Sequence, residues 1–203
     1  MNIAILGTGN IGGTLGDKWA AAGHSVVFGV RDANSAKSQA LLESFPAARL
    51  EAIPLALASA DVVLLAVPWG AVPEVVQSNA GALVGKIVID ATNNFGGPVV
   101  SNVLAVAEAA PMASIFRAFN SLGWEVFARP QFGETQVDMF YCGPEGEARA
   151  QVEQLIQEAG VRPIWLGGLE TVNTVDALGT LWVTLAFQRG WGRRIALKLL
   201  QRS

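Results

Sequence analysis

The sequence predicts an α/β fold in which helices cover both faces of a mostly parallel sheet. Short apolar runs alternate with segments of helical periodicity, the run Val62–Val67 is continuously apolar, and only 15% of the 203 residues are charged. Strands buried on both faces are typical of parallel sheets between helical layers. A charged share below the usual value of about 25% also indicates that much surface is buried, in the sheet or between subunits.

The first thirty residues are the clearest unit. Asn2–Leu6 is a short apolar run that ends in glycines, which predicts a buried strand. The following segment, Asn10–Ala22, repeats large apolar side chains every four residues and stops at Gly23, as an amphipathic helix does. The apolar run Ser25–Val30 comes next. These features predict a strand–helix–strand unit.

The same alternation continues along the rest of the chain. The further strands that we expect are Leu50–Ile53, Asp61–Val67, Lys86–Asp90, Ser114–Phe119, Val137–Cys142 and Arg162–Leu166. The further helices that we expect are Ala36–Ser44, Val100–Glu108, Ala148–Ala159 and Leu169–Phe187. A shift in composition near Gly167 divides a main domain, 1–168, from a small C-terminal helical extension, 169–203.

Bulk properties exclude several functions. A net charge of -3 argues against a nucleic-acid partner, which calls for a basic face. The apolar stretches are shorter than the roughly 20 residues of a membrane helix, and the first residues lack the pattern of a signal peptide. Cys142 is the only cysteine, so the chain has no internal disulfide. We therefore expect a cytoplasmic protein without a membrane partner.

The segment from Gly7 to Gly12 carries the chemistry. It reads Gly7-Thr8-Gly9-Asn10-Ile11-Gly12, and it lies between a predicted strand and a predicted helix, with a second strand soon after. In that context the spacing is the fingerprint of a dinucleotide-binding, Rossmann-type turn. The first glycine permits the turn, the second lets the pyrophosphate approach the backbone, and the third allows the helix to pack on the strand. The purely structural alternative is a glycine-rich turn.

The end of the second strand indicates which nucleotide is bound. Nicotinamide enzymes that use NAD place an acidic residue about twenty positions past the motif, on the ribose. Here that position is Arg31, whose guanidinium favours the 2′-phosphate of NADP, with Ser35 and Lys37 close by. Asp32 leaves residual NADH use open, because a shift of one residue would bring its carboxylate to the ribose. Alternatively, Arg31 is a solvated loop arginine.

Two further loops follow predicted strands, where ligands bind in such sheets. One is Val67-Pro68-Trp69-Gly70, in which the proline takes the chain out of the sheet. The other is Asp90-Ala91-Thr92-Asn93-Asn94. Trp69 packs on the adenosine or covers core, and the asparagines bond to ribose or carboxamide or cap a turn.

Residues for proton transfer are sparse near this turn. The only histidine, His24, precedes the second strand, on the far side from the expected site, and is expected to be structural. Cys142 is expected in the core, and we find no pattern of metal ligands. A carbonyl reductase needs a positioned proton donor, whereas hydride transfer to a flavin-type ring needs mainly proximity and orientation. The inventory favours transfer between two cofactors.

The chain resembles the NADP oxidoreductases that depend on the deazaflavin coenzyme F420, and related bacterial NAD(P)-binding reductases. The cytosolic domains of six-transmembrane ferric reductases share the pattern. The resemblance covers nearly the whole chain, through the pieces Ile5 to Gly12, Gly29-Val30-Arg31, Ala66-Val67-Pro68-Trp69, Asp90-Ala91-Thr92-Asn93, Arg117-Ala118-Phe119-Asn120 and the run from Leu181-Trp182 to Leu200.

The resemblance implies further roles. Thr8 and Asn10 line the pyrophosphate turn, Arg31 contacts the 2′-phosphate, and the protein is a homodimer. The acceptor ring stacks over the nicotinamide near Asn120. Many deazaflavin-dependent members carry a histidine at that position, whereas related reductases of unassigned acceptor carry asparagine, so the acceptor stays open between deazaflavin and others.

The remaining candidates for the acceptor pocket are aromatic or polar neighbours of that segment. Ser121, Trp124 and Trp182 join Asn120 in this set, although the two tryptophans fit core or dimer interface equally well. The leading hypothesis is an NADPH-dependent oxidoreductase that passes hydride to a deazaflavin, FMN or FAD. The alternatives are a reductase of a small carbonyl or imine, and a binding protein that senses NADP(H) without turnover. Neither the acceptor nor the physiological direction follows from the sequence.

Overall fold

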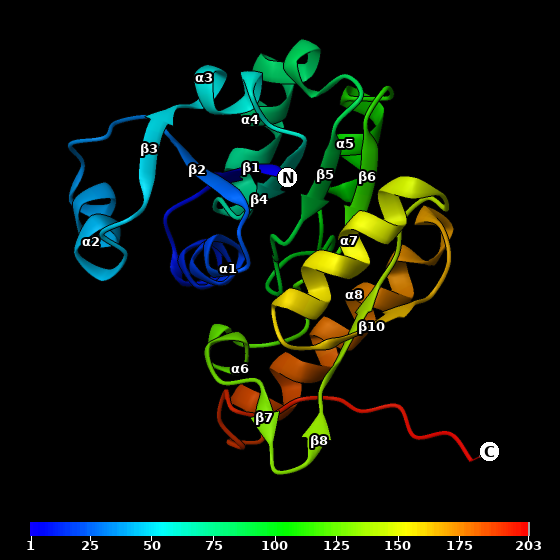
Figure 1. The fold of residues 1–203 in the computed structure, drawn as a ribbon. Helices are drawn as coiled ribbons and strands as arrows, with labels where there is room; N and C mark the ends of the chain where they lie inside the picture. Colours follow the sequence, from blue (N-terminus) through cyan, green and yellow to red (C-terminus); the bar gives the residue numbers. More distant parts are fainter. Residues whose placement is uncertain (203) are drawn as a thin grey trace.

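A computed structural model describes residues 1–202, and a six-stranded parallel sheet lies at its centre (Figure 1). The strands are β1 (Asn2–Leu6), β2 (Ser25–Val30), β3 (Arg49–Ala52), β4 (Val62–Leu65), β5 (Ile87–Asp90) and β6 (Ser114–Arg117). Their order is β3-β2-β1-β4-β5-β6, and every neighbouring pair is parallel. The order reverses between β1 and β4, which confirms the doubly wound, Rossmann-type prediction.

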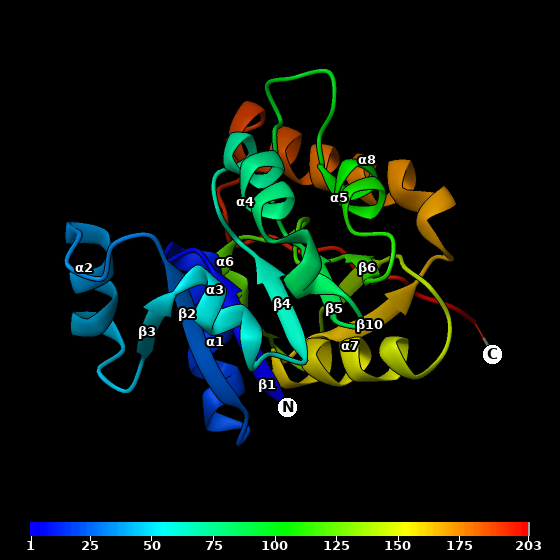
Figure 2. The ribbon, with the colours of Figure 1, turned by 90° about the horizontal axis from the view of Figure 1, so that it is seen from above.

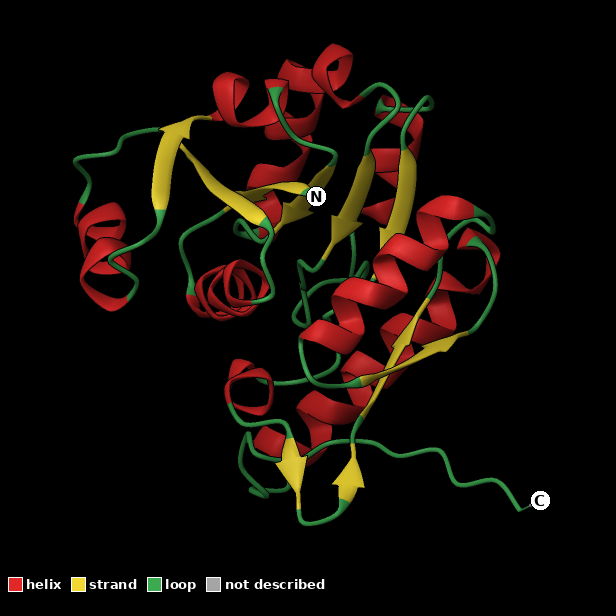
Figure 3. Ribbon diagram, in the orientation of Figure 1, coloured by secondary structure: helices red, strands yellow, loops and turns green. Residues whose placement is uncertain are grey.

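Helices cover both faces of this sheet, as Figures 2 and 3 show. One face packs against α1 (Asn10–Ala21), α2 (Ala36–Ser44), α6 (Trp124–Ala128) and α7 (Glu147–Glu158). The other packs against α3 (Ile53–Ala58), α4 (Val72–Asn79), α5 (Val103–Ala109) and α8 (Val172–Val183). Successive side chains of β1 enter alternate cores: Ile3 and Ile5 enter the first, and Ala4 and Leu6 the second. This alternation explains why the strand is apolar throughout.

A second, smaller unit follows the main sheet. The strands β9 (Asp138–Tyr141) and β10 (Arg162–Trp165) form a separate parallel pair, joined by α7. An antiparallel bridge between Arg117 and Cys142 attaches this unit to the end of β6. The indole Nε1 of Trp19 in α1 also donates to the Leu155 carbonyl of α7, at 3.0 Å.

Several short elements were not expected from the sequence. Helices α3 and α4 both begin at an X-Pro pair, Ile53-Pro54 and Val72-Pro73, that looks like a stop signal. Proline is favoured in the first turn of a helix, because its missing N–H would be unpaired there in any case. Helix α6 and the hairpin of β7 (Gln131–Phe132) with β8 (Thr135–Gln136) are too short for their periodicity to be read.

The C-terminal part differs from the helical extension that we expected. A 3₁₀ turn, η3 (Leu169–Thr171), leads into α8, and the π-helix η4 (Thr184–Gln188) follows. Helix ends there, because Gly190 and Gly192 take φ values of 72° and 77° that are incompatible with an α-helix. Residues 189–202, here called the C-terminal arm, run without regular secondary structure across the molecule (Figure 1).

Candidate cofactor and acceptor site

The glycine-rich turn joins β1 to α1 as predicted. Gly7 has φ 124°, and a side chain there would collide with the Ala66 carbonyl at the end of β4. A Cβ on Gly12 would lie 2.5 Å from the Gly7 carbonyl oxygen and 3.0 Å from Cγ2 of Ile5. Both glycines are therefore required by the turn and by the packing of α1 against β1.

Gly9 differs from its two neighbours, because the protein itself does not require it. Its φ of -81° and ψ of 179° suit any residue, and a Cβ there would meet no atom within 4 Å. It caps the N-terminus of α1, where no side chain accepts from the free backbone N–H groups. An open helix N-terminus with a cleared approach is suited to a phosphate.

The other residues of the turn surround this opening. Thr8 and Ile11 are half-buried, and Asn10 is exposed. Ile11 packs against the core beneath α1, so its contribution at the turn is made through its backbone.

Arg31 lies directly after β2, at the same edge of the sheet. Its side chain is exposed, as is that of Lys37 in α2, and neither joins an ion pair within residues 1–202. Exposed cations without an ion-pair partner suit an anion such as the 2′-phosphate.

Asp32, which left NADH use open in the sequence, is engaged in a turn. Its Oδ1 accepts from the Asn34 N–H at 2.8 Å, and its carbonyl accepts from Ser38 Oγ at 2.8 Å. Ser35 caps α2 by accepting from the Ser38 N–H at 3.3 Å. The Asp32 carboxylate therefore stabilises the loop that presents Arg31.

The loop after β4 leaves the sheet at Pro68. Val67 and Trp69 are half-buried, and a short 3₁₀ turn starts at Trp69. The Trp69 carbonyl accepts from Asn102 Nδ2 at 2.9 Å, which ties this loop to the segment that follows β5. The indole Nε1 of Trp69 is buried and has no partner among the residues described.

The loop after β5 is built around the buried Asp90. Its carboxylate accepts from the N–H and Oγ1 of Thr92, at 2.8 and 2.6 Å, and from the Asn102 N–H at 3.1 Å. Burial raises the pKa of this carboxyl, while the Arg117 charge and the Thr92 and Asn102 hydrogen bonds act against it. The Thr92 hydroxyl therefore bonds within the loop.

Arg117 makes most of the side-chain contacts that hold this site together. In the sequence it was identified only as part of a family motif. Its guanidinium is inaccessible to solvent, with Nε 2.8 Å from Asp176 Oδ1 of α8. Nη1 donates to the carbonyls of Asp90 and Thr92 at 3.1 and 2.6 Å, and Nη2 donates to Asn93 Oδ1 at 2.7 Å. The arginine thus joins β6, the loop after β5 and α8. A charged residue inside the apolar run Ser114–Phe119 was the available signal.

The segment after β6 completes this edge of the sheet. Asn120 and Ser121 are both buried, and the preceding Phe119 has the unusual φ of 60°. The Asn120 carbonyl accepts from Asn93 Nδ2 at 3.1 Å, and Asn120 Nδ2 donates to the Val175 carbonyl at 3.2 Å. Both amide ends of Asn93 are therefore engaged with protein groups. The structure brings the predicted Asn93 and Asn120 together.

The two predicted tryptophans occupy different environments. Trp182 is 5% exposed; its Nε1 donates to the Ile195 carbonyl at 3.1 Å, and the Arg193 guanidinium lies 5.7 Å from its ring. Arg193 also bonds Glu125 Oε1 at 2.6 Å. The C-terminal arm therefore covers Trp182, which favours the core interpretation, whereas Trp124 is only half-buried.

The histidine, the tyrosine and the cysteine of the chain are each engaged within the fold. His24 bonds Glu158 at 2.6 Å and the N-terminal amine at 3.1 Å, so it connects the start of β1 to α7. Tyr141 is buried and donates to Glu153 at 2.5 Å. Cys142 lies in the core, where burial raises its pKa to about 11. Both His24 and Cys142 are placed as predicted.

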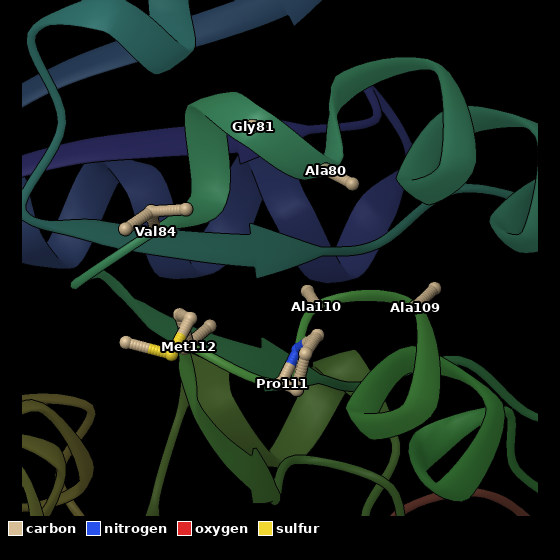
Figure 4. A pocket seen from close by; sticks show the side chains of 8 residues that line it. Ala80, Gly81, Val84, Ala109, Ala110, Pro111 and Met112 are labelled. Atoms are coloured by element: carbon tan, nitrogen blue, oxygen red, sulfur yellow. The ribbon is translucent and has the colours of Figure 1, made fainter.

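One hollow in the surface is apolar and has a volume of about 230 Å³. It is lined by Ala80, Gly81, Val84 and Ala109–Ala113 (Figure 4). It lies beside the amino ends of β5 and β6, opposite the glycine turn, and its lining side chains are small and apolar apart from Met112. Within residues 1–202, no cluster of potential metal ligands occurs, and no helix has the length and apolar content needed to cross a bilayer.

Known proteins resemble this chain in sequence and in fold. Residues 2–94 match the family described as NADP oxidoreductase, coenzyme F420-dependent. The F420-dependent NADP reductase of Methanothermobacter thermautotrophicus is 30% identical over 208 residues, which cover 91% of this chain and 89% of that protein. The chain belongs to this family. It is accordingly an NADP-dependent oxidoreductase, as the resemblance in the sequence predicted.

Two further relatives show how far the likeness to known proteins extends. A solved structure from Arthrobacter, provisionally assigned as an F420-dependent NADP reductase, has a TM-score of 0.88 at 25% identity and covers 99% of this chain and 100% of that one. The rat metalloreductase STEAP3 is 29% identical over 181 residues. The alignment covers 87% of this chain but only 36% of the rat protein.

Proposed function

We propose that this protein transfers hydride between NADP(H) and a flavin or deazaflavin acceptor. The observation that carries this proposal is the state of the charged groups beneath the acceptor side. Asp90, Asp176 and Arg117 are buried and bonded to one another or to the surrounding loops, so none is a free proton donor. Hydride transfer between two cofactor rings requires orientation and exclusion of water, and these loops supply both.

In this proposal the glycine turn and the first loops hold NADP(H). The N–H groups at the start of α1 bind the pyrophosphate, with Thr8 and Asn10 lining the turn and Ile11 contributing backbone. Arg31, Lys37 and Ser35 bind the 2′-phosphate. The fit rests on the empty approach to Gly9 and on the two exposed, unpaired cations.

The loops after β4 and β5 form the floor on which the nicotinamide half rests. Val67, Pro68 and Trp69 form one part of that floor, and Thr92 and Asn93 form the other. The side chains of the last two bond within the protein, so their contribution is to position the backbone. When bound, NADPH supplies the hydride, and these residues orient its ring and exclude water.

The acceptor is proposed to lie above the segment Asn120–Ser121, next to Trp124. Trp182 is covered by the C-terminal arm, so in this proposal it packs behind the acceptor site and does not touch the acceptor. We also propose that residues 1–168 hold the cofactor and that the segment from 169 closes the acceptor side. The contact of Asn120 with Val175 in α8 supports that division.

Stopped-flow absorbance tests the proposal. NADPH is mixed with the protein and, in separate runs, with coenzyme F420, FMN or FAD, and its absorbance is followed. Oxidation with at least one of these rings is expected, with a preference for NADPH over NADH. If the protein binds NADPH but oxidises it with none of them, while a carbonyl or imine does support oxidation, the flavin-type acceptor is wrong.

We further propose a homodimer built on α8 and the arm. Leu181, Phe187 and Trp191 are 42%, 55% and 65% exposed, although they are large apolar side chains. Large apolar side chains that are exposed within one short stretch of chain support an interface there. Light scattering is expected to give twice the chain mass. A monomer for Trp191→Glu with a dimer for Leu55→Glu, an exposed leucine in α3, would assign the interface.

A further inference from the structure

The side chain of Asn120 has one atom that the protein leaves without a partner. Asn120 is 2% exposed, and its Oδ1 bonds to no donor within residues 1–202. An unsatisfied buried acceptor destabilises the folded protein, and native proteins contain few of them. Such an atom calls for a ligand or another specific partner.

The orientation of this amide follows from its other contact. The Val175 carbonyl can only accept a hydrogen bond, and it lies 3.2 Å from Asn120 Nδ2. A flipped amide would place two oxygens at that distance, so the carbonyl end must be the free one. Asn120 Oδ1 is therefore an acceptor, and it selects a ligand that donates a hydrogen bond.

The surrounding residues fix the backbone of Asn120 and the space for its side chain. Phe119 turns the chain with φ 60°, a left-handed conformation that is unfavourable for a bulky residue. Asn93 bonds the Asn120 carbonyl, and Arg117 in turn holds Asn93. On the α8 side, a Cβ on Gly179 would lie 3.2 Å from Asn120 Nδ2, so the glycine allows the helix to come close. Backbone strain that the surroundings maintain is typical of functional sites.

The place of Asn120 in the fold suggests which part of the cofactor it meets. The residue follows β6, at the edge of the sheet that also carries the glycine turn. In a doubly wound sheet the dinucleotide lies across the point where the strand order reverses, one mononucleotide over each half. Arg31 belongs to the β1–β2–β3 half and Asn120 to the β4–β5–β6 half. The adenosine is therefore assigned to the first half and the nicotinamide to the second.

We infer that Asn120 Oδ1 accepts a hydrogen bond from an amide-type N–H of the ligand bound over β5 and β6. This inference rests on the proposed function. Two sources present that group at this position: the carboxamide of the nicotinamide, and an N–H on the acceptor ring. In either case Asn120 reads a donor, and Arg117 is a positioning residue that acts through Asn93.

Calorimetry with an isosteric variant tests the inference. Asn120→Leu is compared with Asn173→Leu, an exposed asparagine of α8, for binding of NADP and of its 3-acetylpyridine analogue, in which a methyl group replaces the carboxamide nitrogen. If the carboxamide is the donor, Asn120→Leu weakens NADP binding about tenfold or more and leaves binding of the analogue unchanged. If the acceptor is the donor, NADP binding is unchanged and the KM for the acceptor rises by a similar factor.

A second variant covers the case in which Asn120→Leu does not fold. Gly179→Ala keeps the Asn120 side chain but displaces its amide group by a few tenths of an ångström. Gly81→Ala is the control, because a Cβ there meets no atom within 4 Å. A smaller loss in the same binding constant is expected for Gly179→Ala alone. Unchanged NADP affinity and unchanged acceptor KM in both variants would overturn the inference. Failure of the unaltered protein to bind NADP would instead overturn the proposed function.

Discussion

The guanidinium Nε of Arg117 and the carboxylate Oδ1 of Asp176 lie 2.8 Å apart, both buried, and they join the end of β6 to α8. Ser101 donates to the other carboxylate oxygen at 2.7 Å, so the loop after β5 shares the contact. Segments from three parts of the chain thus meet at one ion pair. Its integrity should control both stability and the geometry of the acceptor side.

Breaking this pair from one side should be costly. Asp176→Leu removes the carboxylate that bonds the buried Arg117 charge and leaves only Asp90, 3.8 Å away, so we expect a loss of about 3–5 kcal/mol in the free energy of unfolding. Urea denaturation measures it. The double variant Arg117→Met with Asp176→Leu should recover part of the loss, because it removes both charges. Arg49→Met, at a surface pair with Glu51, is the control. A single-variant loss no larger than that of the control would contradict the prediction.

Arg31 should discriminate between the two nicotinamide cofactors. Arg31→Ala removes a charge-assisted contact to the 2′-phosphate, and a loss of about ten- to a hundredfold in NADPH affinity is expected. NADH affinity should change little, because NADH lacks that phosphate. Calorimetry with both nucleotides measures the two effects, and Arg49→Ala provides an exposed arginine away from the turn. Equal losses for NADPH and NADH would show that Arg31 does not read the phosphate.

Gly9 and Gly12 should respond to alanine in opposite ways. At Gly9 a Cβ meets no protein atom within 4 Å, so Gly9→Ala should leave thermal unfolding nearly unchanged but weaken NADP binding at least tenfold. At Gly12 a Cβ would lie 2.5 Å from the Gly7 carbonyl oxygen, so Gly12→Ala should lower Tm markedly. Calorimetric unfolding and nucleotide titration of both variants separate the two effects. A Gly9→Ala protein that binds NADP normally would remove the main support for the phosphate site.

Acid should release the C-terminal arm through Asp138. Burial raises the pKa of this carboxyl, but the hydrogen bonds from Arg162, the Leu199 N–H and Lys198 outweigh burial and leave the pKa below the ordinary 3.8. Because the pKa of Asp138 is lower in the folded protein, its carboxylate stabilises the docked arm at any pH above the pKa of the unfolded chain. That contribution is lost as the pH falls through the pKa of the folded protein. The fluorescence of Trp182, which is buried beneath the arm and donates to its Ile195 carbonyl, should report this release.

Asp138→Asn provides the matched control for the acid transition. This variant cannot ionise, so its arm should be loosened already at neutral pH and should show no further release in acid. Limited proteolysis at neutral pH and in acid measures the docking of the C-terminal arm independently. An acid release with the same midpoint in the variant and in the unaltered protein would assign the transition to another group.

The sequence alone determined the features that depend on short stretches of chain. The strand–helix–strand unit, the turn from Gly7 to Gly12 and the position of Arg31 follow from local periodicity, glycine spacing and distance along the chain. The sequence did not predict several short elements, and the reason is also local. A proline in the first turn of α3 or α4 looks the same in the sequence as a proline that ends an element.

Only the tertiary structure decided what happens on the acceptor side. The contacts of Arg117 with Asn93 and Asp176 join residues 24 and 59 positions apart, and the contact of Asn120 with Val175 spans 55. No local pattern encodes such pairs, because burial, and not spacing, obliges each polar group to find its partner. Asn120 Oδ1 is a buried polar atom that has no such partner within residues 1–202. The sequence identified Asn120 as a candidate site residue, but it could not give the orientation of its side chain.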